Sequence, residues 1–201
     1  PLDSQNIKSD HRPGNRIGYG GYYATIDGSL DAGSALLLKP YLDDLLRKGF
    51  SPIGQEELNR YVLHADANGK HVGLVAAGDG AVRMALDAFS LAKKLNRRPD
   101  SRHRLIKAHL LSPEDLGRLS DLGIVAVLTP AYCVEALGWI NDRIGSQRSR
   151  YAFAARSILD RGMPMAFGTD WPVTPLNPMT GLYAAVTRRD TAGYPAGGWQ
   201  P

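Results

Sequence analysis

The sequence predicts an α/β fold in which short strands alternate with helices, as in a (β/α)8 barrel of the TIM type. From residue 70 onward, short apolar runs alternate with segments whose apolar residues recur at helical spacing, which is the pattern of serial βα units and a parallel sheet. The sequence also lacks the glycine-rich dinucleotide fingerprint and the phosphate loop typical of many doubly wound sheets. About four to five βα units are visible, so we predict a partial barrel.

The first part of the chain predicts two strands and two helices. Residues 14–26 are rich in glycine and tyrosine and predict one strand, and residues 55–68 predict an amphipathic helix that Gly69 closes. Residues 71–76 form an apolar run that predicts a second strand. Residues 81–95 place their apolar side chains three and four positions apart, which predicts a packed helix.

The middle of the chain repeats this order. Residues 103–109 predict a strand, and residues 112–115 then open a helix with a serine N-cap, a first-turn proline and two acids. Gly123 ends that helix, and residues 124–128 predict the next strand.

The last part begins with a broad helical region that ends with residues 151–160. Residues 165–167 predict the final strand. Residues 169–178 are too rich in proline for regular structure, and residues 179–187 predict a closing helix.

Composition excludes several classes of protein. The 201 residues carry a net charge of +4 that is spread over the chain rather than gathered on one helix face, which argues against nucleic-acid binding. Cys133 is the single cysteine, so no internal disulfide forms. The sequence has no apolar run of about 18 residues and opens with no signal peptide. We expect a cytoplasmic protein with a small-molecule substrate and no membrane association.

Polar residues at the predicted carboxyl ends of strands are the candidate site residues, because ligands meet parallel sheets there. The candidate catalytic residues are Tyr23, Lys107, His109 and Asp170. The candidate substrate-binding residues are Asp79, Tyr132 and Trp171.

Lys107 lies inside an apolar strand pattern. Period-2 alternation puts Leu105, Lys107 and His109 on one face of that strand. If this face looks into the barrel, Lys107 is a candidate base or Schiff-base nucleophile. The alternative is that Lys107 pairs with a carboxylate or lies along the barrel rim.

Asp170 follows the apolar strand at residues 165–167, and the next residues, Trp171 and Pro172, would fix its loop. A carboxylate in this place serves as a metal ligand or a general base, or else it caps backbone amides of the loop. The five histidines form neither an HxH nor an HExxH motif, the spacings of common zinc sites.

Several segments resemble the YtcJ-like branch of the amidohydrolase superfamily, which includes N-substituted formamide deformylases. The resemblance extends from about Gly18 to the end of the chain. The segments are Asp27-Gly28-Ser29-Leu30, Gly78-Asp79 with Ala81-Val82, Arg102-His103-Arg104, Ser112-Pro113-Glu114-Asp115, Gly168-Thr169-Asp170-Trp171-Pro172-Val173, Pro175-Leu176-Asn177-Pro178 and Tyr183-Ala184-Ala185-Val186-Thr187-Arg188.

The resemblance implies a (β/α)8 barrel with a small β-sandwich, one or two divalent metals such as zinc, and hydrolysis of an amide-type C–N bond by metal-activated water. The family's metal-binding aspartate falls on Asp170, and its HxH motif would precede Pro1. The resemblance therefore implies that residues 1–201 are the C-terminal part of an amidohydrolase-like barrel domain. The absence of an initiator methionine at Pro1 also predicts a fragment.

The other family ligands are replaced. Tyr23 stands where a bridging lysine is expected, and Val75 and Lys107 stand where histidines are expected. Valine cannot bind a metal, and an ammonium repels one. We expect a degenerate metal site in which any retained metal binds Asp170, so the cofactor stays undetermined.

Three functions remain open. The first is an amidohydrolase-like hydrolase acting on an amide-type C–N bond. The second is a metal-independent lyase, hydratase or retro-aldolase that uses Lys107 and Asp170, helped by Tyr23 and His109. The third is a non-catalytic remnant or a half that needs a complementary chain. Because a partial barrel exposes strand edges, we expect a homo-oligomer or pairing with the missing N-terminal half.

Overall fold

Five parallel strands form the sheet of this protein, for which a computed structural model describes residues 21–199. His11 and the part of the first predicted strand before residue 21 lie outside these residues. The strands are β1 (Gly21–Thr25), β2 (His71–Ala76), β3 (Arg104–Lys107), β4 (Val125–Leu128) and β5 (Met165–Phe167).

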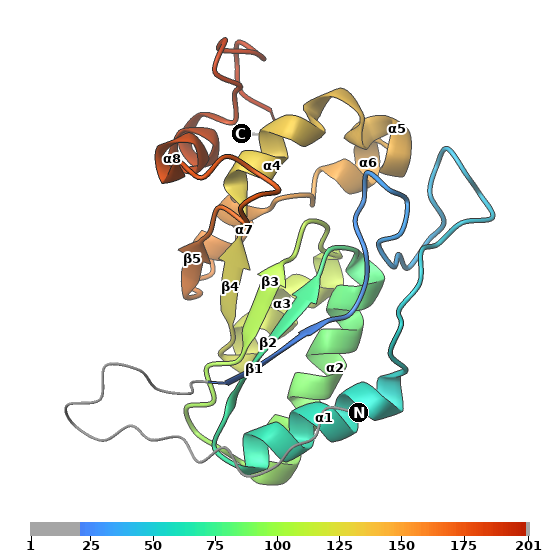
Figure 1. The fold of residues 1–201 in the computed structure, drawn as a ribbon, viewed down its shortest axis with the longest axis vertical. Helices are drawn as coiled ribbons and strands as arrows, with labels where there is room; N and C mark the ends of the chain where they lie inside the picture. The colour runs from blue at the N-terminus through green and yellow to red at the C-terminus, as the bar shows by residue number, and fades with distance from the viewer. Residues whose placement is uncertain (1–20, 200–201) are drawn as a thin grey trace.

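The strand order is β1-β2-β3-β4-β5, so each strand lies beside the next strand of the sequence (Figure 1). A doubly wound sheet reverses its strand order at a switch point, whereas a barrel adds its strands in series. This sheet has no reversal among its five strands. The fold is therefore α/β, with the serial βα units of a partial (β/α)8 barrel.

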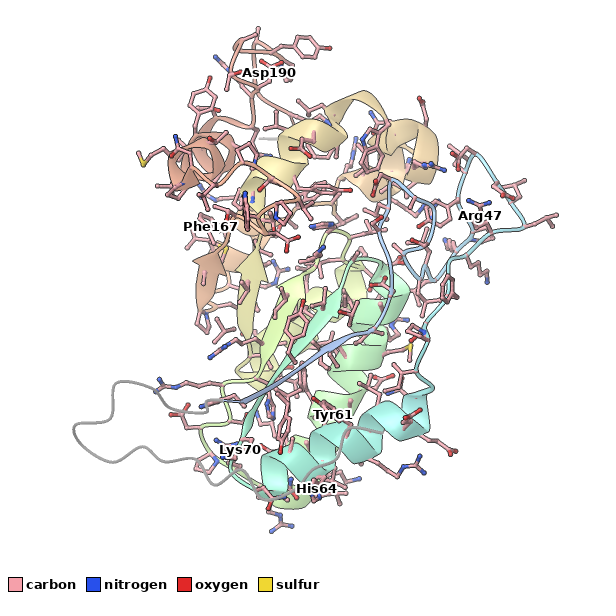
Figure 2. The ribbon with its side chains drawn as sticks, in the orientation of Figure 1. Arg47, Tyr61, His64, Lys70, Phe167 and Asp190 are labelled. Carbon is pink, nitrogen blue, oxygen red and sulfur yellow. The ribbon has the colours of Figure 1, made fainter. Side chains whose placement is uncertain are left out.

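Three helices cover one face of the sheet: α1 (Gln55–Ala67), α2 (Asp79–Asn96) and α3 (Pro113–Leu122). The main core forms between these helices and the strand residues that point toward them, including Leu74, Leu105 and Ala126. Tyr61 of α1 packs edge-on against Tyr22 of β1, with ring centroids 5.8 Å apart, and Figure 2 shows it beside the sheet.

The alternate strand residues form the opposite face, which includes Tyr23, Gly73 and Ile106. A side chain built on Gly73 would meet both Ile106 and Tyr23, so these three positions share one surface. In a closed barrel this surface is the interior. Tyr23 is well exposed there, because no described element covers its side of β1.

Helix α3 has the end signals that its sequence predicts. The Ser112 hydroxyl accepts the backbone N–H of Asp115, and Pro113 occupies the first turn. Gly123 ends the helix in the left-handed region with a φ of 66°, a conformation that glycine adopts without a steric penalty.

The predicted broad helical region is instead broken into short pieces. They are α4 (Pro130–Glu135), a 3-10 turn (Ala136–Gly138), α5 (Ile140–Ile144), α6 (Ser146–Ser149) and α7 (Ala155–Leu159). Gly145 and Phe153 interrupt the region with φ angles of 80° and 50°, which an α-helix cannot contain. α4, the 3-10 turn and α5 contribute to a second core with Tyr41 and Phe153, beyond the carboxyl ends of the strands, whereas Ile158 of α7 belongs to the main core.

Helix α8 (Pro178–Thr187) follows the loop after β5 and packs on α4 (Figure 1). Its N-cap is Asn177, whose side chain accepts the backbone N–H of Met179. Among residues 21–199, no helix has the length and apolar character needed to cross a membrane.

Candidate functional site

An ion pair joins Lys107 and Asp170 at the carboxyl ends of two strands. Lys107 ends β3 and Asp170 follows β5, with β4 between them. The Lys107 Nζ atom lies 3.0 Å from Asp170 Oδ2, and the two side chains are 21% and 36% exposed. The pair therefore lies at the rim of the barrel interior, partly open to solvent, as the active sites of this fold class do.

The backbone conformation at the end of β3 directs the Lys107 side chain toward Asp170. In the sheet register Lys107 lies beside Ala76, which belongs to the helix-facing core. The φ angles of Lys107 and Ala108 are 74° and 44°, so the strand geometry ends there and the side chain turns away from the helices. Asp170 also has a positive φ, 52°. Such angles are uncommon for residues other than glycine and often occur at functional sites.

The predicted alternation through residues 105–109 is therefore wrong. Leu105 is buried under the helices, Lys107 reaches Asp170, and His109 is buried in the second core. The three side chains do not share one face, because period-2 alternation holds only while the backbone stays extended. Lys107 pairs with a carboxylate in this structure, and a catalytic role for it remains a prediction.

His109 is enclosed by aromatic rings rather than placed beside the ion pair. Its ring stacks on Tyr132 at 4.6 Å between centroids and lies 5.0 Å from Phe153. Both ring nitrogens are buried without a hydrogen-bond partner among residues 21–199. Burial lowers the pKa of His109 to about 3, and the charge of Lys107 acts in the same direction. His109 is thus a neutral residue of the second core, and a catalytic role for it remains a prediction.

The candidate substrate-binding residues lie in three different surroundings. Tyr132 is buried, and its hydroxyl donates to Asp31 Oδ1 at 2.6 Å. Asp79 is buried at the start of α2, where it accepts the backbone N–H of Leu38 and where burial raises its pKa. Trp171 is 64% exposed next to Asp170. Trp171 is therefore the exposed one of the three, and a substrate-binding role for each of them remains a prediction.

Asp27 has a positioning role that the sequence alone does not reveal. Its carboxylate accepts the backbone N–H groups of Leu36, Ala77 and Gly78 at 2.8 to 2.9 Å. Burial raises the pKa of Asp27 to about 6, although these three bonds and the charge of Lys107 lower it. The sequence shows an acid directly after an apolar strand. It does not show which backbone N–H groups this acid binds, because those groups are distant in sequence.

These features place the chain in the class of serial βα barrel proteins, with its candidate site at the carboxyl ends of the strands. The profile described as "Amidohydrolase family" matches residues 3–199. The chain belongs to the amidohydrolase family.

Individual relatives agree with this assignment. The chain is 32% identical over 178 residues to "Putative amidohydrolase YtcJ" of Bacillus subtilis (strain 168), a match that covers 89% of this chain and 33% of that protein. It is 33% identical over 170 residues to "Protein LONG AFTER FAR-RED 3" of Arabidopsis thaliana, covering 84% of this chain and 29% of that protein. The chain thus spans about a third of the length of these relatives.

A solved structure shares the same fold. The crystal structure of an uncharacterized metal-dependent hydrolase from Pyrococcus horikoshii OT3 superposes with a TM-score of 0.79 at 31% identity. The match covers 88% of this chain and 35% of that one.

Residues 21–199 do not by themselves offer the ligands for the pair of divalent metals that the family resemblance implies. Within residues 21–199, no three His, Cys, Asp or Glu side chains are grouped closely enough to hold a metal ion. Val75 offers no donor atom, and the Asp170 carboxylate already faces an ammonium at 3.0 Å. A cation bound to Asp170 would be repelled by Lys107 unless the ion pair separated.

Proposed function

We propose that this chain is the C-terminal part of an amidohydrolase barrel domain and that it hydrolyses an amide-type C–N bond of a small molecule. The Lys107–Asp170 pair carries the proposal, because it combines a proton acceptor and a fixed positive charge at the strand ends. Membership of the amidohydrolase family and the similarity to a hydrolase structure support it.

The pair can supply the groups that the reaction requires. Asp170 takes a proton from water while the water oxygen attacks the carbonyl carbon. The Lys107 ammonium donates to the carbonyl oxygen and stabilises the negative charge that forms on it. When the C–N bond breaks, the proton on Asp170 passes to the departing nitrogen. The products are a carboxylic acid and an amine, and no step in this sequence uses a metal.

Removing either member of the pair tests this proposal. We expect Asp170→Asn and Lys107→Met each to lower kcat/KM for an N-acyl amine at least ~100-fold, the usual scale for losing a proton carrier or an oxyanion donor. The exposed lysine Lys94 of α2 provides the control, and Lys94→Met should leave turnover unchanged. Release of the amine is the measurement.

Measuring the metal content tests separately whether turnover depends on a bound divalent metal. We expect turnover to survive treatment with a chelator, and metal analysis of the active protein to find less than ~0.1 divalent ion per chain. One zinc per chain, together with loss of turnover on chelation, would overturn the metal-free mechanism while leaving the hydrolase assignment in place.

The same pair also supports a second candidate, a metal-independent lyase, hydratase or retro-aldolase. In a Schiff-base form of that reaction, the Lys107 amine condenses with a substrate carbonyl and water leaves. Borohydride would then reduce the imine, and mass spectrometry would find the substrate attached at Lys107. Amine release without trapping supports the hydrolase, and trapping without amine release supports the lyase. If neither occurs, the chain is a non-catalytic half.

A further inference from the structure

A buried carboxylate, that of Asp27, is connected through the backbone to the turn that carries Lys107. The ends of β1, β2 and β3 lie side by side (Figure 1), and Asp27 follows β1. Asp27 Oδ1 accepts the N–H of Ala77 at 2.8 Å. The same trans peptide group carries the carbonyl of Ala76, which accepts the N–H of Ala108 at 2.8 Å. Because a peptide group is rigid and planar, Asp27 fixes the direction of the carbonyl that holds Ala108.

The next peptide group repeats this connection. Asp27 Oδ2 accepts the N–H of Gly78 at 2.9 Å. The carbonyl of the same peptide group belongs to Ala77, and it accepts the N–H of Leu110 at 2.9 Å. Both peptide groups therefore lie between the Asp27 carboxylate and the backbone that follows β3.

The backbone held in this way contains the left-handed turn at the end of β3. Lys107 and Ala108 have φ angles of 74° and 44°, which cost free energy for residues other than glycine and persist only where the surroundings impose them. The bonds to Ala108 and Leu110 hold this backbone, one within the turn and one shortly after it. The turn brings the Lys107 Nζ atom to 3.0 Å from Asp170.

Asp27 acts on Lys107 through this backbone rather than as its ion-pair partner. The two oxygens of Asp27 already accept three backbone N–H groups, those of Leu36, Ala77 and Gly78. Burial raises the pKa of Asp27 to about 6, while these bonds and the charge of Lys107 lower it. The carboxylate is therefore mostly ionised at pH 7, and hydrogen bonds to an ionised acceptor are stronger than neutral ones.

We propose that Asp27 is a positioning residue for Lys107. By holding the two peptide groups at the end of β2, it imposes the left-handed turn at the end of β3 and keeps the ammonium beside Asp170. This inference rests on the proposed hydrolase function, in which that ammonium stabilises the charge on the substrate carbonyl oxygen. A role in stability alone would leave Lys107 in place in every folded variant.

Chemical labelling reports the position of Lys107 without relying on turnover. Trace acetylation with acetic anhydride, followed by mass spectrometry, gives the labelling rate of Lys107 relative to that of the exposed Lys94. Asp27→Asn replaces one acceptor oxygen by a donor, so it cannot hold all three N–H groups. We expect this variant to raise the ratio at least ~3-fold, the scale of releasing a partly exposed ion pair. An unchanged ratio in the folded variant overturns the positioning role.

Asp66→Asn is the matched control. Asp66 is also buried and accepts from the side chains of Asn96 at 2.9 Å and Arg98 at 3.2 Å. It lies in the last turn of α1, 3.2 Å from His103 Nε2 and therefore near the start of β3. The same substitution at this end of the strands should leave the labelling ratio of Lys107 unchanged.

Asp27→Glu separates the placement of the carboxylate from its charge. Glutamate keeps the negative charge, but its additional methylene group moves the carboxylate away from the three N–H groups. We expect the labelling of Lys107 to rise in this variant as well. A rise in Asp27→Asn without any rise in a folded Asp27→Glu would show that charge alone protects Lys107, and it would overturn the positioning role.

Native-state hydrogen exchange of the parent chain covers the case in which neither variant folds. The amides of Ala77 and Gly78 donate to Asp27, and those of Ala108 and Leu110 donate to the carbonyls behind them. If the four amides open as one cooperative unit, their protection factors agree within ~10-fold. Exchange at Ala77 and Gly78 that exceeds this margin over Ala108 and Leu110 would show that the turn holds without Asp27.

Turnover separates this inference from the proposed function. Asp27→Asn should lower kcat at least ~10-fold with little change in KM, because a displaced ammonium stabilises the transition state less well. In the Lys107→Met background the same substitution should have no further effect. Equal losses in both backgrounds would keep the hydrolase and overturn the positioning role. A raised labelling ratio in a chain whose parent releases no amine would keep the positioning role and overturn the hydrolase.

Discussion

Three residues with positive φ angles, Lys107, Ala108 and Asp170, decide where the ion pair forms. The sequence placed Lys107 and Asp170 at strand ends because an apolar run gives way to polar residues at both points. The metal-independent hypothesis also paired these two residues, but the geometry of their contact depends on a left-handed turn at the end of β3 and on the position of β5 two strands away. Neither feature has a local sequence signal, since lysine and alanine seldom adopt such angles.

The burial of His109 predicts how the free energy of unfolding depends on pH. Burial holds its folded-state pKa near 3, whereas an unfolded histidine titrates near 6.5. Between these values the unfolded chain binds more protons, so the free energy of unfolding falls as the pH falls from 6.5 toward 3. A His109→Phe variant keeps an aromatic ring beside Tyr132 and Phe153 but has no group that binds a proton in this pH range.

Urea unfolding at pH 7 and pH 4.5 measures the effect. The parent chain should lose roughly 2 to 3 kcal/mol more than His109→Phe between the two pH values. Burial also lowers the pKa of His103, to about 4. His103 is present in both proteins, so its contribution to the pH dependence cancels when the two losses are compared. Equal losses in the two proteins would show that the ring of His109 is able to accept a proton in the folded state.

Among the elements, those with strong local signals were predicted well. The strand at residues 165–167 and the caps of α3 agree with the structure, because proline, glycine and capping residues act over a few positions. The region after β4 was predicted as one broad helical segment, but its pieces follow the second core, where Tyr41 and Ile140 meet from distant parts of the chain. Packing of this kind is not encoded in periodicity.

Ser112 makes the stability of α3 testable. Its hydroxyl accepts the Asp115 backbone N–H, donates to Asp115 Oδ2 at 2.9 Å and accepts from Arg83 at 3.0 Å. Ser112→Ala should lower the free energy of unfolding by about 1 to 2 kcal/mol, as the loss of an N-cap does. Ser120→Ala on the exposed side of the same helix should change it by less than ~0.5 kcal/mol. Equal effects in thermal or chemical unfolding would contradict a capping role.

At the scale of the whole molecule, the sheet is an arc with two edges. Among the described strands, β1 pairs only with β2 and β5 pairs only with β4. Beside β5 lies an apolar patch formed by Leu159, Phe167 and Val186, which lines a broad groove between α7 and α8. Figure 2 shows Phe167 on this side of the molecule and Arg47 on the opposite side. An open edge next to an apolar patch favours pairing with another polypeptide.

We therefore expect the 201-residue chain to self-associate at tens of micromolar, with the β5 edge and the patch of Leu159, Phe167 and Val186 in the interface. Val186 is 84% exposed in this patch, and Leu46, beside Arg47 on the far loop, is 98% exposed. Both side chains are apolar and solvent-facing, so they form a matched pair. Light scattering after size-exclusion chromatography should find that Val186→Glu lowers the associated fraction several-fold and that Leu46→Glu does not. A parent chain that runs as a single monomeric species at these concentrations would contradict the expectation, because its exposed edge would then need no partner.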